Sequence, residues 1–224
     1  MTKAPALLLA LAALAAGCER GANPLPGEAR TETPVAGPIL TSEAAELLSK
    51  PGELVIGGEQ PHQANLTHSV YTHARPAQCP FMVAEESPLL PKNPLAENSA
   101  WWDTDGAHTV VEVAAIYPSG FDAPGFLAEA RQRLAACYGE QVVALTDQEQ
   151  GGQGTFQRGP EAGTPNAQLW SWGRTGVWTC QYGLVAKHNA VAEVASCEQS
   201  GAFDLRSLVL AKERRMDQLA RPQV

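Results

Sequence analysis

The segment from Trp178 to Cys197, WTCQYGLVAKHNAVAEVASC, constrains the fold more than any other part of the chain. Two runs of apolar and β-branched residues flank His188-Asn189, a pattern that predicts a β-hairpin with a two-residue turn. Counting outward from this turn places Cys180 opposite Cys197, on a non-hydrogen-bonded pair, where opposed Cα atoms approach within disulfide range. Because disulfides persist in oxidising compartments, the hairpin predicts a protein that lies outside the cytoplasm.

One acidic residue fits the regular hairpin poorly. In this register Glu193 shares a face with Tyr182 and Leu184, and a carboxylate is costly to bury beside apolar side chains unless it is paired. A β-bulge would shift the alternation and move Glu193 to the other face. The regular register and the bulged one are both open from the sequence.

Residues 1–17 predict a lipoprotein signal peptide. Lys3 precedes an Ala/Leu run that is too short to span a bilayer as a permanent helix. The run ends in Leu-Ala-Ala-Gly before Cys18, which resembles the lipobox of bacterial lipoproteins and predicts acylation of Cys18. An ordinary cleaved leader with a stray cysteine is the alternative. Residues 18–38 are rich in Gly, Pro, Glu and Thr, and they predict a flexible tether.

The cysteine count is consistent with this assignment. Five cysteines leave one over after two disulfides, and Cys18 has the lipid role. Since the hairpin pairs Cys180 with Cys197, the remaining connectivity joins Cys79 to Cys137. In the loop-entropy model the Cys79–Cys137 bond would stabilise the fold by about 4 kcal/mol and the hairpin bond by about 3 kcal/mol.

Hydrophobic periodicity and turn residues predict the other elements. The length of 224 residues suits a single core, and residues 39–224 form the predicted domain. The Gly, Gln and Pro content of residues 149–166 predicts a loop, and Asp105-Gly106 predicts a turn into a strand. Strands are predicted at 108–117, 141–146, 167–174, 177–187 and 190–197, and helices starting at Thr41 or Ser42, at Asp122, which precedes a helix ending in Cys137, and at Asp204.

Charge argues against a nucleic-acid partner, because a formal net charge of -8 repels phosphate backbones. The basic residues Lys212, Arg214 and Arg215 of the last helix are interpreted as a solvated helix face. Three histidines, His62, His68 and His73, have spacings that fit no familiar metal site. No metal and no cofactor are therefore predicted.

The sequence contains no H-E-x-x-H, G-x-S-x-G, C-x-x-C or Walker motif. Structural crosslinking of the four domain cysteines also removes the usual thiol nucleophile. We therefore predict no catalytic residue, with a hydrolase of unrecognised site as a minor alternative. Trp170, Trp172 and Trp178 lie at strand parity with one another. Core packing is the favoured interpretation, but they are the best candidates for an aromatic ligand-binding wall.

A family resemblance follows from the order of several short motifs. They are Leu40-Thr-Ser-Glu, Gln78-Cys79, Tyr117-Pro-Ser, the helix ending in Cys137, Trp178-Thr-Cys-Gln, Asn189 and Cys197. Together they resemble the PknH-like extracellular sensor domain over roughly residues 39–219, with the W-T-C-Q hairpin the most specific part. The resemblance implies an α+β domain, a twisted antiparallel sheet with packed helices. It also implies disulfides joining the first to the second and the third to the fourth domain cysteine, and a cleft for an unknown small ligand.

The predicted function is therefore a non-catalytic sensor or binding domain, lipid-anchored at the extracytoplasmic face of the cell membrane. Its expected partners are the membrane, through the N-terminal lipid, and a small or lipidic ligand in a cleft. The alternative is an envelope protein-interaction module that regulates a partner enzyme or receptor. Nucleic acid is not an expected partner.

Overall fold

The computed structural model describes residues 37–56, 58–64, 73–79, 89–104, 108–145, 151–174, 178–198 and 203–220. The predicted signal peptide, Cys18, nearly all of the tether and His68 lie outside these ranges. The described residues all belong to one compact unit, Pro34–Val224.

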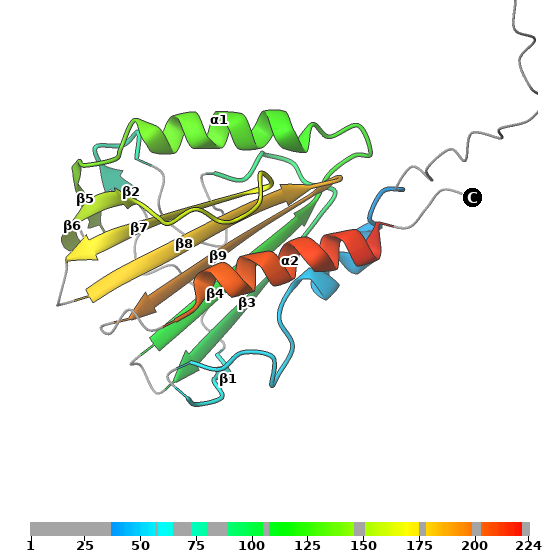
Figure 1. Cartoon of the computed structure of the whole chain (residues 1–224), viewed down its shortest axis with the longest axis horizontal. Helices are drawn as coiled ribbons and strands as arrows, with labels where there is room; N and C mark the ends of the chain where they lie inside the picture. The colour runs from blue at the N-terminus through cyan, green and yellow to red at the C-terminus, as the bar shows by residue number, and fades with distance from the viewer. Residues whose placement is uncertain are drawn as a thin grey trace, which may run out of the picture. The chain divides into compact units, whose positions relative to one another are not determined.

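Nine strands of the described chain form one antiparallel sheet, in the order β1-β3-β4-β9-β8-β7-β6-β5-β2 (Figure 1). The hairpin formed by β8 and β9 lies in the middle, and the short strands β1 and β2 form the edges. Short edge strands leave few unpaired backbone groups. The strands are β1 His62–Gln63, β2 His73–Arg75, β3 Ala96–Thr104, β4 His108–Ile116, β5 Gln141–Leu145, β6 Gly151–Arg158, β7 Ala167–Arg174, β8 Trp178–Lys187 and β9 Ala190–Glu198.

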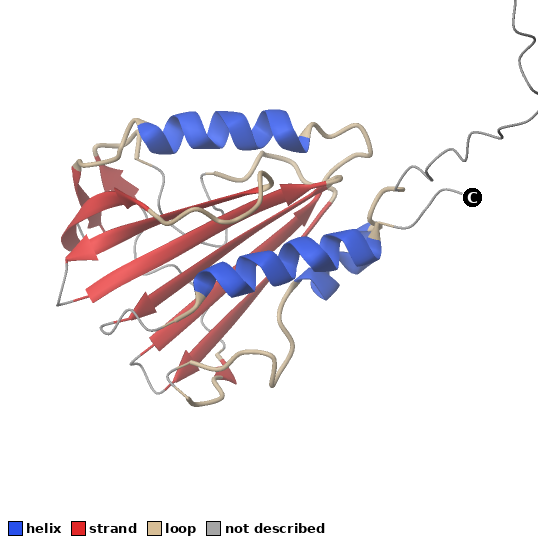
Figure 2. Cartoon of the chain, viewed as in Figure 1, coloured by secondary structure: helices blue, strands red, loops and turns tan. Residues whose placement is uncertain are grey.

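Helices cover both faces of the sheet (Figure 2). The α-helix α1 (Ala123–Ala135) packs on β7 and β8 from one side. On the other side α2 (Leu205–Leu219) packs on β8 and β9, and the 3-10 helix η1 (Thr41–Leu47) packs on β3 and β4. This arrangement confirms the predicted fold class, an α+β domain with an antiparallel sheet and packed helices.

The three predicted helix starts are confirmed, since η1 begins at Thr41, α1 follows Asp122 and α2 follows Asp204. Asp122 Oδ1 accepts a hydrogen bond from the backbone N–H of Gly125 at 3.0 Å, and Asp204 caps α2 in the same way. At η1 the N-cap residue is Leu40, so neither Thr41 nor Ser42 has the capping role. There Glu43 Oε2, in the first turn, accepts from the backbone N–H of Leu40 at 3.0 Å.

The central hairpin has the regular register. Cys180 pairs with Cys197 and the two form a disulfide, while His188, with φ of 54°, and Asn189 make the turn. The alternative with a bulge is wrong, because Glu193 pairs directly with Leu184 and the ladder continues without a break.

The second predicted disulfide, Cys79–Cys137, is also present. Cys137 follows the end of α1, and both sulfurs are buried among the apolar side chains beneath that helix. The bond therefore joins the end of α1 to the segment that follows edge strand β2.

Residues 149–166 do not form the predicted loop throughout, since β6 runs from Gly151 to Arg158 between β5 and β7. The glycines that suggested a loop allow a close approach of two backbones. A Cβ atom at Gly154 would lie 2.8 Å from backbone atoms of Gly173 in β7, nearer than real Cβ contacts occur. Sequence analysis likewise missed β3, whose end it interpreted only as part of a turn.

Each face of the sheet has its own apolar core. Strand alternation sends one set of side chains toward α1 and the other toward α2 and η1. Members of the α1-side core include Leu127, Leu134, Trp170, Trp172 and Tyr182, and members of the α2-side core include Ile39, Leu47, Trp102, Val209 and Met216.

The point at which the chain enters the domain is fixed by Asn189 in the hairpin turn. Its Oδ1 accepts from the backbone N–H of Ile39 at 2.8 Å. Its Nδ2 donates to the carbonyls of Ile39 at 3.0 Å and of Tyr117 at 2.9 Å. Asn189 is 4% exposed, and buried hydrogen bonds of this kind hold a backbone segment in one position. The residues that follow the predicted tether are therefore attached to the central hairpin.

Candidate functional site

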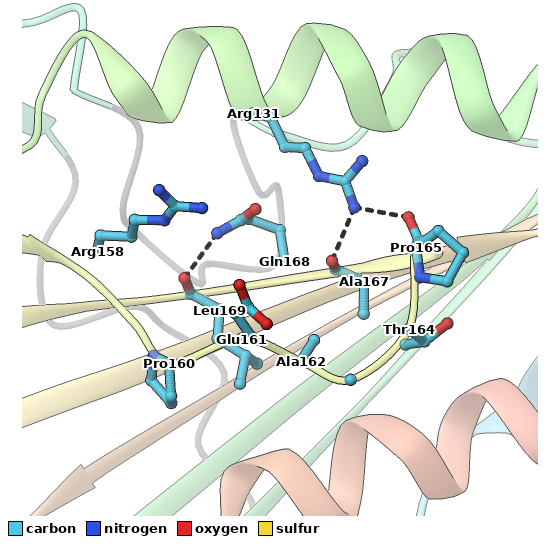
Figure 3. A pocket seen from close by; sticks show the side chains of 11 residues that line it. Arg131, Arg158, Pro160, Glu161, Ala162, Thr164, Pro165, Ala167, Gln168 and Leu169 are labelled. Carbon is cyan, nitrogen blue, oxygen red and sulfur yellow. Dashed lines mark hydrogen bonds between the residues drawn. The ribbon is translucent and has the colours of Figure 1, made fainter.

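A pocket of about 510 Å³ lies between α1 and the segment that joins β6 to β7, and we call it the α1 pocket (Figure 3). Its volume falls within the range typical of small-molecule sites. Its lining residues are Arg131, Arg158, Pro160, Glu161, Ala162, Gly163, Thr164, Pro165, Ala167, Gln168 and Leu169.

Arg131 enters the α1 pocket from the buried side of α1. Its Nη2 donates to the carbonyl oxygens of Pro165 at 2.6 Å and of Ala167 at 3.0 Å. These two bonds tie α1 to the β6–β7 segment and hold the guanidinium in one orientation. The acceptors are neutral carbonyls, so the positive charge of Arg131 is not cancelled by them.

A second guanidinium, that of Arg158, comes from the end of β6. Figure 3 shows Gln168 between Arg131 and Arg158. Arg158 is exposed, and among the described residues it makes no hydrogen bond or ion pair. Glu161 is the acidic residue of the lining. The pocket therefore carries two positive charges and one negative charge in a chain whose net charge is -8.

Tyr138 lies beside the α1 pocket. The Gln168 Nε2 donates to its hydroxyl at 3.4 Å and to the carbonyl of Leu169 at 2.9 Å. Burial raises the pKa of Tyr138, and the charges of Arg158 and Arg131 oppose that rise. Both guanidiniums therefore act electrostatically on the same phenol group.

The floor of the α1 pocket is also held from the α2 side. Arg206 Nε donates to the carbonyl of Ala162 at 3.2 Å. Glu213 Oε1 accepts from Thr164 Oγ1 at 3.0 Å and from Asn166 Nδ2 at 2.7 Å. The β6–β7 segment is thus bound by both helices, so contacts within the protein fix the shape of the pocket it lines.

A second pocket, of about 540 Å³, lies beside the start of α2. Two of its charged groups already hold structure, since Asp204 caps α2 and Arg206 binds a backbone carbonyl. Arg158 lines this pocket too. We regard the α1 pocket as the better candidate because Arg206 in the second pocket lies near the carboxylate of Asp204, whose pKa its charge helps to lower, whereas Arg131 is held by neutral carbonyls.

Core packing, the favoured interpretation of the tryptophans, is confirmed for Trp170 and Trp172, so these two do not form the aromatic wall offered as a ligand site. Trp170 and Trp172 are each 1% exposed, so they pack in the α1-side core and offer no open ring face. Trp170 stacks on Tyr182 with ring centroids 5.4 Å apart, and Trp172 Nε1 donates to the carbonyl of Val142 at 3.0 Å. Trp170 borders the second pocket, while the side chain of Trp178 lies outside the described part of the structure. Strand parity correctly places Trp170 and Trp172 on one face of the sheet. They are buried because α1 covers that face.

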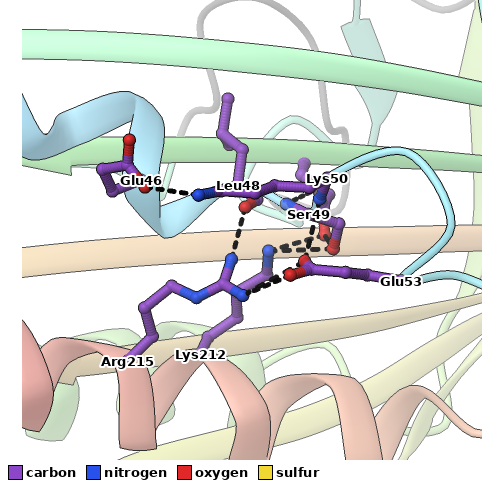
Figure 4. Close-up of polar contacts among 8 residues, drawn as sticks. Glu46, Leu48, Ser49, Lys50, Glu53, Lys212 and Arg215 are labelled. Carbon is purple, nitrogen blue, oxygen red and sulfur yellow. Dashed lines mark hydrogen bonds and ion pairs between the residues drawn. The ribbon is translucent and has the colours of Figure 1, made fainter.

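A Ser–Lys–Glu cluster lies between α2 and the sheet (Figure 4). Lys212 Nζ lies 2.8 Å from Glu112 Oε1 and 3.1 Å from Ser49 Oγ. Ser49 donates its hydroxyl and its backbone N–H to Glu112, both at 2.7 Å. The side chains of Lys212 and Glu112 are 3% and 1% exposed. A lysine beside a serine can activate a nucleophile, but this cluster is covered by η1 and α2, and it serves to join them.

Burial also corrects the interpretation of the last helix as a solvated basic face. Burial lowers the pKa of Lys212, and the carboxylate of Glu112 opposes that shift. Arg215 donates to both carboxylate oxygens of Glu53 at 2.9 and 3.1 Å, and to the carbonyl of Leu48. Of the three basic residues, Arg214 is the exposed one.

Histidine positions give no metal site within the described ranges. His62 is in β1 and His73 in β2, at opposite edges of the sheet. No group of three or more His, Cys, Asp or Glu side chains in those ranges could hold a metal ion.

Sequence analysis did not identify the α1 pocket. Arg131 and Arg158 belong to different elements, and no local motif links an arginine inside a helix to one at a strand end. The available signal was weak. Arg131 falls on the helix face that also presents Leu127 and Leu134, and a charged residue on an apolar face needs a partner.

Comparisons with known proteins agree with the fold. A model of the PknH-like extracellular domain matches residues 96–212, just over half of the 224 residues. The fold is similar to the crystal structure of the extracellular domain of PknH from Mycobacterium tuberculosis, with a TM-score of 0.67. Sequence identity to it is 18%, over 83% of this chain and 98% of that one.

No curated protein matches the chain. In the described residues no helix has the length and apolar character needed to cross a membrane. The family match and the fold agree with the disulfide framework and the W-T-C-Q hairpin. The chain belongs to the PknH-like extracellular domain family.

Proposed function

We propose that this protein is a lipid-anchored sensor domain of the cell envelope, on the extracytoplasmic side, that binds a small ligand without catalysing a reaction. Membership of an extracellular domain family and two disulfides support the location. A C-terminal domain behind a lipidated Cys18 and a tether would face away from the membrane.

The observation that carries the binding role is the α1 pocket. It is a concave site whose floor is held by Arg131 on one side and by α2 on the other. Two guanidiniums border it without carboxylate partners among the described residues. Binding sites are typically pre-formed and contain a few polar groups that orient the ligand. This pattern supports a small polar ligand over a purely lipidic one.

The non-catalytic part of the proposal draws on the Ser–Lys–Glu cluster. Ser49 is 8% exposed and donates to Glu112, and Lys212 is charge-paired. A substrate carbonyl could not approach Ser49 without displacing η1. Within the described ranges, the alternative of a protein-interaction module has support only from single exposed apolar side chains, Leu40, Val55 and Leu95, which are normal on soluble domains.

Native mass spectrometry of the protein purified from the envelope tests the binding role. We expect a co-purifying small molecule in the wild-type protein and its loss in Gln168→Phe, which places a ring between Arg131 and Arg158. Gln132→Phe, on an exposed position of α1 outside the pocket, is the control and should retain the molecule. An adduct that persists in Gln168→Phe, or no adduct in any variant, would contradict binding in the α1 pocket.

The anchor is tested separately. Replacing Cys18 by Ala should release the protein from the membrane fraction, because a single anchor of two or three acyl chains, at about 0.8 kcal/mol per buried CH2, accounts for the attachment. The measurement is the share of protein in the soluble fraction, by immunoblot. Full membrane retention of Cys18→Ala would rule out lipidation at this residue.

A further inference from the structure

We propose that the α1 pocket binds an oxyanion group, a phosphate or a carboxylate, held by Arg131 and Arg158. This inference rests on the ligand-binding function proposed above and names the chemistry of that ligand. It starts from the pattern of charge pairing in the described residues.

The two guanidiniums of the α1 pocket differ in their partners from the buried basic residues of α2. On the α2 side Lys212 forms an ion pair with Glu112, and Arg215 forms one with Glu53. On the α1 side Arg131 forms no ion pair with any described residue, and the same is true of Arg158. Arg206 and Arg214 of α2 also form no ion pair in the described chain, so what distinguishes Arg131 is that two neutral carbonyls hold its guanidinium at the wall of a pocket. An incoming anion would supply the missing partner.

Arg131 is pre-organised for this role. Its Nη2 is held by the carbonyls of Pro165 and Ala167, which fixes the plane of the guanidinium. The N–H groups on Nε and Nη1 have no partner in the described part of the chain. A guanidinium that is already immobilised loses little conformational entropy on binding, and its planar donors match carboxylate and phosphate oxygens.

The two arginines act on the same end of the pocket. Figure 3 shows them on either side of Gln168, and both lower the pKa of Tyr138 against the effect of its burial. The hydroxyl of Tyr138 lies 3.4 Å from Gln168 Nε2. An oxyanion near Gln168 would therefore meet two guanidiniums.

The rest of the pocket fits an organic molecule. A volume of about 510 Å³ exceeds the need of an inorganic ion, and Pro160, Ala162 and Leu169 provide apolar wall. Glu161 lines the same space, and its carboxylate should weaken binding of an anion. Removing that charge is therefore expected to have the opposite effect from removing an arginine.

Four proteins test the inference: the wild type and the variants Arg158→Gln, Glu161→Gln and Arg214→Gln. The probes are inorganic phosphate and acetate at constant ionic strength, followed by calorimetry, and vesicles containing phosphatidylglycerol, followed by co-sedimentation. Arg158→Gln should weaken binding at least about tenfold, as expected for a lost charge-assisted hydrogen bond. Glu161→Gln should tighten it. Arg214→Gln, an equal charge change on the exposed face of α2, should leave it unchanged.

The outcomes show whether the anion is a soluble molecule or a lipid headgroup, and one of them would overturn the oxyanion inference. Binding of the free anions indicates a soluble ligand, and binding of the vesicles alone indicates a lipid headgroup; either supports the inference if Arg158→Gln reduces it selectively. Equal weakening by Arg158→Gln and Arg214→Gln would show only a general charge effect and overturn it. The side chain of Arg158 is exposed and makes no hydrogen bond in the described structure, so this variant should fold normally.

Failure of the inference can be distinguished from failure of the proposed function. If neither anions nor vesicles bind, but an uncharged molecule co-purifies and is lost in Gln168→Phe, the oxyanion inference is wrong and the binding function stands. If no probe binds and no co-purifying molecule responds to Gln168→Phe, both are wrong.

Discussion

Replacing Lys212 with Met should lower the free energy of unfolding by about 3–5 kcal/mol, because it leaves the buried carboxylate of Glu112 without its charge partner. Glu112 would keep its bonds from Ser49, but these do not compensate a negative charge in the α2-side core. Since the cluster joins α2, η1 and the sheet, contacts between all three should loosen together. Denaturant unfolding followed by tryptophan fluorescence measures the loss.

Two further variants show whether the ion pair is the cause. The double variant Lys212→Met with Glu112→Gln removes both charges and should recover a large part of the loss, because no buried charge is left unpaired. Arg214→Met, two residues along α2 and exposed, should stay within about 0.5 kcal/mol of the wild type. A Lys212→Met protein as stable as Arg214→Met would contradict the structural role of the cluster.

Removing the Cys79–Cys137 disulfide should also have a large effect. The double variant Cys79→Ala with Cys137→Ala is expected to lose about 4 kcal/mol, and Cys180→Ala with Cys197→Ala about 3 kcal/mol. The order follows from the loops that the bonds close, with sequence separations of 58 and 17. Equilibrium unfolding of both variants under oxidising conditions gives the comparison.

The control for the disulfides is a reducing agent. Added reductant should destabilise the wild type toward the level of a quadruple variant that combines all four Cys→Ala changes, and it should leave that variant unchanged. Thiol titration of the denatured, unreduced protein should find none of Cys79, Cys137, Cys180 and Cys197 free. Four free thiols in protein isolated from the envelope would refute the disulfide framework.

The parts of the fold that sequence predicted correctly depend on local rules. The hairpin register follows from counting outward from the His188-Asn189 turn, and the regular alternation of β8 and β9 then fixes the opposition of Cys180 and Cys197. The caps Asp122 and Asp204 likewise need only the residues of one helical turn. Such features need no knowledge of the rest of the chain.

The parts that sequence missed depend on long-range packing. β6 is a strand because Gly154 lets it approach Gly173, a contact that composition cannot reveal. Lys212 looks like a surface residue until Glu112, far away in the sequence, is placed opposite it. The burial of Trp170 could not be predicted for the same reason. Strand parity indicates which face of the sheet it occupies, but not that a helix covers that face.

The α1 pocket illustrates the same limit at the site itself. Arg131 comes from a helix and Arg158 from a strand that sequence analysis interpreted as part of a loop. Their meeting depends on the β6–β7 segment, which Arg131 and α2 hold in place. Sequence analysis could therefore predict a binding domain by family resemblance, but not which residues line its candidate site.

The most direct test of the account is a crystal structure of the protein purified from the envelope with its co-purifying ligand retained. The account predicts ligand density in the α1 pocket, with an oxyanion within hydrogen-bond distance of Arg131 and Arg158. Density confined to the second pocket beside the start of α2, or a ligand with no contact to either arginine, would contradict it.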